Sequence, residues 1–143
     1  MADRCQIFRL VASIRHDQYL ISYIMNDIIA ASSGGANADT VTNCVSDLSD
    51  YFTSHIHNEE RLIYVLGYPK WCEHDKDHEN LIDSIGSLVE RHLSISLREC
   101  MALKRMFSEH AQKFDKALLS HALTGNQSID GRKELHRCGE AYA

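Results

Sequence analysis

Proline and glycine are scarce in this sequence, which contains one proline and seven glycines in 143 residues. Half of these eight residues fall in two clusters, Gly34-Gly35 and Gly67-Tyr68-Pro69. Both residue types interrupt helices, proline because it lacks the backbone N–H and glycine because of its large conformational entropy. Long segments between a few clustered breaks predict long helices joined by short turns.

Paired cysteines are also missing. Cysteine occurs five times, an odd number, and no two cysteines form a C-x-x-C pair. The spacing indicates neither a disulfide framework nor a thiolate metal site. We expect all five to be reduced and to fill space: Cys5, Cys44, Cys72, Cys100 and Cys138.

Long apolar runs and concentrations of basic residues are absent as well. No run approaches the ~20 apolar residues that a membrane-spanning helix needs, and Met1 to Ile7 lacks the pattern of a secretion signal. Fifteen basic and 20 acidic side chains give a formal charge of −5 without a basic cluster. Neither nucleic acid nor a membrane is therefore an expected partner, and we expect a cytoplasmic protein.

The sequence does have apolar side chains at helical spacing, in four segments. An apolar content of 44% in 143 residues is enough for the core of one domain. The predicted helices run from about 4 to 32, 39 to 66, 70 to 93 and 97 to 124. Such helices favour an all-α, up-down-up-down antiparallel four-helix bundle over residues 1–125, followed by a polar tail or linker over residues 126–143.

Two of these helices carry pairs of metal-binding residue types on a core-facing stripe. His55 and Glu59 lie four residues apart in the second helix, as do His74 and His78 in the third. Residues four apart share one helix face, about one turn (~6 Å) from each other. His55 and Glu59 also continue an apolar stripe, and buried polar groups need partners.

Position along the helices predicts that further candidates meet these pairs. In antiparallel helices, residues equally distant from the connecting turn lie at one height. His16 is 19 residues before Gly35 and His55 is 20 after it, while His78 is 17 before Ile95 and His110 is 15 after it. By the same count, Asp115 reaches the level of His74. The predicted metal ligands are His16, His55, Glu59, His74, His78, His110 and Asp115.

The donor types restrict the metal. Imidazoles and carboxylates without a thiolate suit iron, manganese or zinc. Seven ligands that include two carboxylates suit a dinuclear site of octahedral metals better than tetrahedral zinc, which favours iron.

The ligand order resembles the hemerythrin family, specifically bacterial hemerythrin-like domains. The resemblance spans about residues 15–118 and is strongest over His55-Ile56-His57-Asn58-Glu59-Glu60-Arg61-Leu62 and Gly67-Tyr68-Pro69. It implies two iron ions with a bridging oxo or hydroxo group. In that arrangement His74, His78 and His110 would bind one iron, His16 and His55 the other, and Glu59 and Asp115 would bridge them.

The resemblance also implies reversible dioxygen binding at the iron that carries two histidines, and no catalytic residues. A histidine-rich, dry pocket favours binding over oxidation chemistry. Around that pocket the chain departs from the family, in which aliphatic residues and a tryptophan are common. The predicted pocket residues are Tyr19, Ile56, Met106, Phe107 and Ala111. They suggest a less tightly sealed pocket with a phenol near the ligand, and hence fast autoxidation.

Several functions stay open at this point. We expect an oxygen- or redox-sensing domain, since bacterial hemerythrin domains are often fused to signalling outputs such as a diguanylate cyclase, and the tail over residues 126–143 is where such a connection would begin. The alternatives are an oxygen carrier or store, a di-iron enzyme (a peroxidase, a nitric-oxide-handling protein or a ferroxidase), and a metal-free structural bundle.

Overall fold

The computed structural model describes residues 3–35, 37–91 and 95–124, which form helices joined by short connections and contain no strand. The helices are α1 (Arg4–Ser33), α2 (Ala38–Leu66), α3 (Trp71–Arg91), α4 (Leu97–His110), the π-helical η1 (Ala111–Asp115) and α5 (Lys116–Thr124). The last three follow one another without a break and form one rod. The prediction of an all-helical chain is confirmed, while the tail predicted over residues 126–143 lies outside the described residues.

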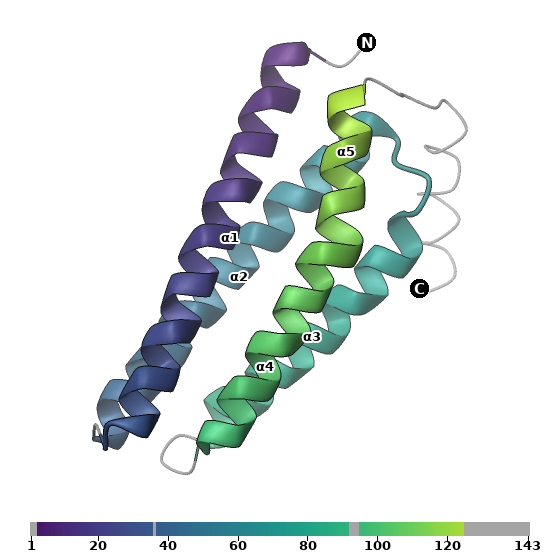
Figure 1. Cartoon of the computed structure of the whole chain (residues 1–143). Coiled ribbons are helices and arrows are strands. Elements are labelled where there is room, and N and C mark those ends of the chain that lie inside the picture. Colours follow the sequence, from purple (N-terminus) through teal and green to yellow (C-terminus); the bar gives the residue numbers. More distant parts are fainter. Residues whose placement is uncertain (1–2, 36, 92–94, 125–143) are drawn as a thin grey trace.

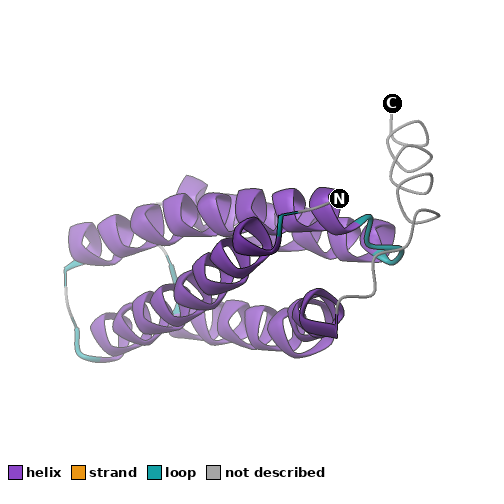
Figure 2. Ribbon diagram, turned by 90° about the horizontal axis from the view of Figure 1, so that it is seen from above, coloured by secondary structure: helices purple, strands orange, loops and turns teal. Residues whose placement is uncertain are grey.

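The helices lie side by side, and successive helices meet at opposite ends of the molecule (Figure 1). α1 packs against α2 and α4, and α3 packs against the same two helices. Seen along the perpendicular direction, the rods are linked by short loops (Figure 2). No helix in the described ranges is both long and apolar enough to span a membrane.

The helix ends follow from local hydrogen bonds. The Asn37 side chain accepts a hydrogen bond from the Thr40 N–H at 2.9 Å, so α2 begins at Ala38, slightly before the predicted start. Gly67 ends α2 in a left-handed conformation, with φ of 62°, which glycine adopts without a steric penalty. Ser96 and Glu99 form a capping box at the start of α4.

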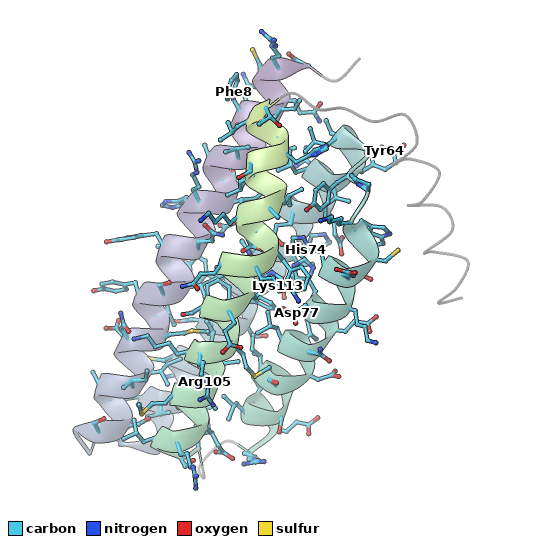
Figure 3. The ribbon with its side chains drawn as sticks, turned by 45° about the vertical axis from the view of Figure 1, so that its right-hand side comes forward. Phe8, Tyr64, His74, Asp77, Arg105 and Lys113 are labelled. Atoms are coloured by element: carbon cyan, nitrogen blue, oxygen red, sulfur yellow. The ribbon has the colours of Figure 1, made fainter. Side chains whose placement is uncertain are left out.

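The apolar core is divided by a layer of buried polar residues. One apolar cluster includes Leu48 and Phe52 of α2, and the other includes Leu62 and Leu66 of the same helix. The buried polar residues are Asp17, His55, Glu59, His74, His78, His110 and Asp115. Phe8 and Tyr64, by contrast, point away from the rods (Figure 3).

The cysteines differ in part from the prediction. Cys72 is disulfide-bonded, so the expectation that all five are reduced is wrong for this residue. Cys5, Cys44 and Cys100 are free, and of these Cys100 alone is buried.

Candidate metal centre

Two pairs of candidate ligands lie on α2 and α3. His55 and Glu59 are one turn apart on α2, and both are 0% exposed. On α3, His74 is 0% and His78 is 2% exposed. Figure 3 shows His74 in the interior, between the helices. The four-residue spacing therefore places each pair on one inward helix face, as the sequence predicts.

The third pair, His110 and Asp115, flanks the π-helical segment. In a regular α-helix, five residues turn through about 500° and would leave Asp115 about 140° away from His110. The Lys116 N–H instead bonds to the Ala111 carbonyl, five residues back, which widens the turn. Asp115 thereby returns to the face of His110, and both side chains are buried.

One oxygen of each carboxylate faces the histidines of α3 and α4: three of them for Glu59 and two for Asp115. Glu59 Oε2 lies 2.9 Å from His74 Nε2 and 2.6 Å from His78 Nε2. Asp115 Oδ1 lies 2.7 Å from His110 Nε2 and 3.2 Å from His74 Nε2. These five residues present ligand atoms within 4.8 Å of one another, an arrangement that could hold a metal ion.

The other oxygen of each carboxylate faces the opposite way, toward His55. His55 Nε2 lies 2.9 Å from Glu59 Oε1 and 3.2 Å from Asp115 Oδ2. Gln18 of α1 completes this side, because its Nε2 donates a hydrogen bond to Asp115 Oδ2 at 2.8 Å. Two groups of donors thus share Glu59 and Asp115.

His16 does not join them, and its predicted place inside the helices is wrong. The inward stripe of α1 includes Ile14, Asp17 and Ile21, which are buried, whereas His16 is exposed. Two residues after Ile14, His16 is rotated by about 200° from that stripe. The apolar spacing of α1 carried this signal, which would have pointed to Asp17 and Gln18.

The predicted pocket residues separate in the same way. Tyr19 is 69% exposed, so the prediction of a phenol beside the site is wrong: one residue after Gln18, it is rotated by about 100°. Ile56 and Phe107 are buried. Met106 is half-buried and accepts a hydrogen bond from the Ser84 hydroxyl at 3.6 Å, and Ala111 is half-buried at the start of η1.

Aromatic rings cover the polar layer, including two that had not been predicted as pocket residues. Phe52 packs against His55 and edge-on to His78, with ring centroids 6.2 and 6.5 Å apart. Phe107 lies edge-on to His55 at 5.9 Å. Phe114 stacks on His74 at 5.5 Å. These contacts keep water from much of the site, which strengthens its electrostatic interactions.

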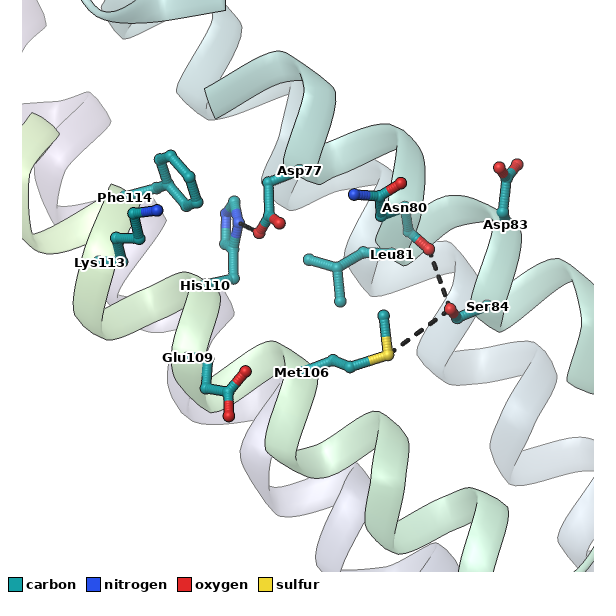
Figure 4. A pocket seen from close by; sticks show the side chains of 10 residues that line it. All are labelled: Asp77, Asn80, Leu81, Asp83, Ser84, Met106, Glu109, His110, Lys113 and Phe114. Carbon is teal, nitrogen blue, oxygen red and sulfur yellow. Dashed lines mark hydrogen bonds and ion pairs between the residues drawn. The ribbon is translucent and has the colours of Figure 1, made fainter. Parts of the chain in front are cut away.

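A carboxylate outside the polar layer, which the sequence did not reveal, holds His110. The His110 Nδ1 donates a hydrogen bond to Asp77 Oδ2 at 2.7 Å. Both residues line a surface groove of about 610 Å³ (Figure 4). Such a bond directs Nε2 inward and fixes the tautomer. Asp77 lies three residues after His74 on α3, but the histidine that it holds, His110, lies on α4, so the spacing along the sequence could not show this contact.

The histidines and carboxylates of the site shift each other's pKa values. Burial alone would lower the pKa of His55 and of His110, but Glu59 and Asp115 outweigh it and raise both pKa values to about 10. Burial and the Glu59 charge oppose ionisation of Asp115, yet the close approach of His110, His55 and His74 holds its pKa at about 2. Burial lowers the pKa of His78. A bound cation would replace the imidazolium protons as the partner of the carboxylates.

The site also passes a geometric test for a metal. Glu59 Oε1, His110 Nε2 and Asp115 Oδ1 are buried near groups of opposite charge, but none makes a hydrogen bond of good geometry within the described part of the chain. Atoms that approach closely without aligning as donor and acceptor suit a common centre between them. Imidazole and carboxylate donors are ordinary ligands of divalent metals.

Comparisons of the chain with protein-family models, curated proteins and solved structures give no match. The resemblance to hemerythrins therefore stays a prediction, and the structure shows a buried cluster of His, Glu and Asp that could hold a metal ion.

Proposed function

We propose that this chain is a dioxygen-binding domain of the hemerythrin type, an antiparallel four-helix bundle that holds two iron ions. The observation that carries the proposal is the orientation of Glu59 and Asp115. Each turns one oxygen toward the group of three histidines and the other toward His55. Two carboxylates shared in this way suit two adjacent metal positions.

The donors favour iron over zinc. Structural zinc is held by four ligands, commonly with thiolates, and catalytic zinc by three protein ligands. Here four buried imidazoles and two carboxylates converge without a thiolate. This number of donors fits two octahedral ions, of which iron is the one that supplies electrons to dioxygen.

The surroundings favour binding over turnover. His74, His78 and His110 all face the shared carboxylates, which leaves the side of His55 and Gln18 for an external ligand. Phe52 and Phe107 wall that side and exclude water, so protons that would drive release of reduced oxygen are scarce. The residues position the metals and keep the pocket dry.

A sensing role is part of the proposal and is supported by the sequence alone. Residues 126–143 are polar, with Gly131 and Gly139, as expected of a linker toward a signalling output such as a diguanylate cyclase. The carrier or storage alternative shares the same site, and the two differ in whether oxygen changes the activity of a linked output domain.

The test is anaerobic loading with Fe(II), followed by metal analysis and optical spectra before and after exposure to air. We expect two irons per chain and a charge-transfer band that appears with oxygen and disappears under vacuum. His78→Ala should lose both. His57→Ala is the matched control, because the His57 side chain is 73% exposed. A chain without stoichiometric metal would refute the proposal.

A di-iron enzyme is the second candidate, favoured by the groove that reaches His110. Asp77, Glu109 and Lys113 line it and could admit a small polar substrate. Steady turnover of hydrogen peroxide, nitric oxide or Fe(II) by the loaded protein would favour this function, and stoichiometric oxygen uptake without turnover would exclude it.

A further inference from the structure

We propose that the two metal positions are unequal: the position formed by His74, His78 and His110 fills first and tightly, and the position beside His55 and Gln18 binds its metal weakly and reversibly. This inference rests on the proposed two-metal function. It concerns a property that the ligand set predicted from the sequence would not give, because that set places a second imidazole from the first helix beside His55.

The two positions differ in the identity of their donors. The tight position has three imidazole nitrogens together with Glu59 Oε2 and Asp115 Oδ1. The weak position has the single imidazole of His55 and the remaining two carboxylate oxygens. Its fourth neighbour is an uncharged amide, and a neutral amide oxygen is a poorer ligand than imidazole for first-row divalent metals.

Gln18 is held in an orientation that opposes metal binding at the weak position. Its Nε2 donates to Asp115 Oδ2, the same oxygen that the weak position needs. A metal there must displace this hydrogen bond, and the amide must turn so that its carbonyl oxygen faces the ion, since only that atom can donate a lone pair. Both steps cost free energy that an imidazole ligand would not require.

The histidines of the two positions also differ in their outer hydrogen-bond partners. His110 of the tight position donates from Nδ1 to Asp77, which directs Nε2 at the site. The Nδ1 of His55 is buried and makes no hydrogen bond with any described residue. His74 shares that feature, but it has two companions, whereas His55 is the only imidazole of its position.

Charge also makes binding of the second ion weaker. Both positions draw on the same two carboxylates, so the first ion neutralises much of the negative charge that would attract the second. Like charges at such separations repel strongly in a site with little water. A one-metal form therefore persists at limiting metal, and the domain becomes competent for oxygen only when metal is abundant.

The experiment is a titration of the metal-free chain with Co(II), monitored by its visible absorption and by competition with a chelator. We expect two steps, with dissociation constants separated by roughly 100-fold. Gln18→His should tighten the second step by roughly 10- to 100-fold and leave the first unchanged. Gln18→Glu provides a second variant of nearly the same size and should also tighten the second step.

His16→Gln is the matched control, two residues away on the same helix and exposed, and should change neither step. Two equal steps in the wild-type chain, or an unchanged second step in both Gln18 variants, would overturn the inference while leaving two-metal binding intact. Absence of any Co(II) binding in the wild-type chain and in Gln18→His would refute the two-metal site itself.

Discussion

Replacing Asp77 by asparagine removes the negative charge behind His110 and keeps the size of the side chain. The Asp77 carboxylate accepts the hydrogen bond from His110 Nδ1 at 2.7 Å, while the opposite nitrogen of the same ring lies 2.7 Å from Asp115. An amide oxygen can still accept from Nδ1, but hydrogen bonds to a carboxylate are roughly twice as strong as neutral ones. The substituted amide can also present its NH₂ group and favour the wrong tautomer of His110.

The magnitude follows from this geometry. Loss of an outer partner of a metal-bound histidine typically costs 10- to 100-fold in metal affinity, about 1.4 to 2.7 kcal/mol. The Asp77 side chain is 31% exposed and lies on the groove, so solvent screens part of its charge. We therefore expect a loss near the lower end, about tenfold.

The assay is competition for Co(II) between the protein and a chelator, with Asp77→Asn compared with Asp83→Asn. Asp83 lines the same groove and is exposed, so its substitution changes the net charge equally without touching a histidine. Affinity should fall only in Asp77→Asn. Equal losses in the two variants would show that bulk charge is responsible, and no loss in either would refute the role of Asp77.

Three further outcomes are expected. Deleting Gln112 makes the His110–Asp115 spacing four residues, so a regular α-helix would keep both side chains on one face. The melting temperature of the metal-free chain, measured by circular dichroism, should therefore rise. A lower melting temperature would contradict the interpretation of η1 as a widened turn. Phe107→Ala removes the ring beside His55 and should lower the free energy of unfolding in urea by about 3–5 kcal/mol. It should also speed autoxidation, measured as faster decay of the oxygen-dependent absorption. An unchanged decay rate would contradict the role of Phe107 in sealing the pocket. Metal binding should release protons and become tighter as the pH rises toward 10, because the metal must displace protons from histidines whose pKa values are raised to about 10. Calorimetry in buffers of different ionisation enthalpy measures the number of protons released. A metal affinity that does not depend on pH would refute this expectation.

The stability of the folded chain depends on pH through Asp115 in the acid range and through His55 in the alkaline range, with opposite signs. The pKa of Asp115 is about 2 in the folded chain, below its ordinary value near 4. Its contribution to stability is therefore fully present above pH ~4 and is lost as the pH falls through about 2. For His55 the stabilising charge is present below its ordinary pKa and is lost as the pH rises through about 10.

Local sequence by itself determined the helices and two of the pairs of candidate ligands. Breaks at Gly35 and Gly67, together with capping residues, define where helices begin and end, because those effects act over a few residues. His55 and Glu59 could be assigned to one face because a four-residue spacing nearly closes one α-helical turn. The sequence could not separate His16 from Gln18 by height alone, since height along a helix says nothing about rotation around its axis.

The tertiary structure decided everything that depends on contact between helices. Only packing shows that α1 presents Gln18 to Asp115, and that Asp77 on α3 holds His110 on α4. The sequence also did not predict the widened turn of η1. A five-residue spacing places His110 and Asp115 on one face only when the helix widens in this way. The rotation of each helix about its own axis depends on the whole apolar face that it buries, and that face is oriented by packing against the neighbouring helices.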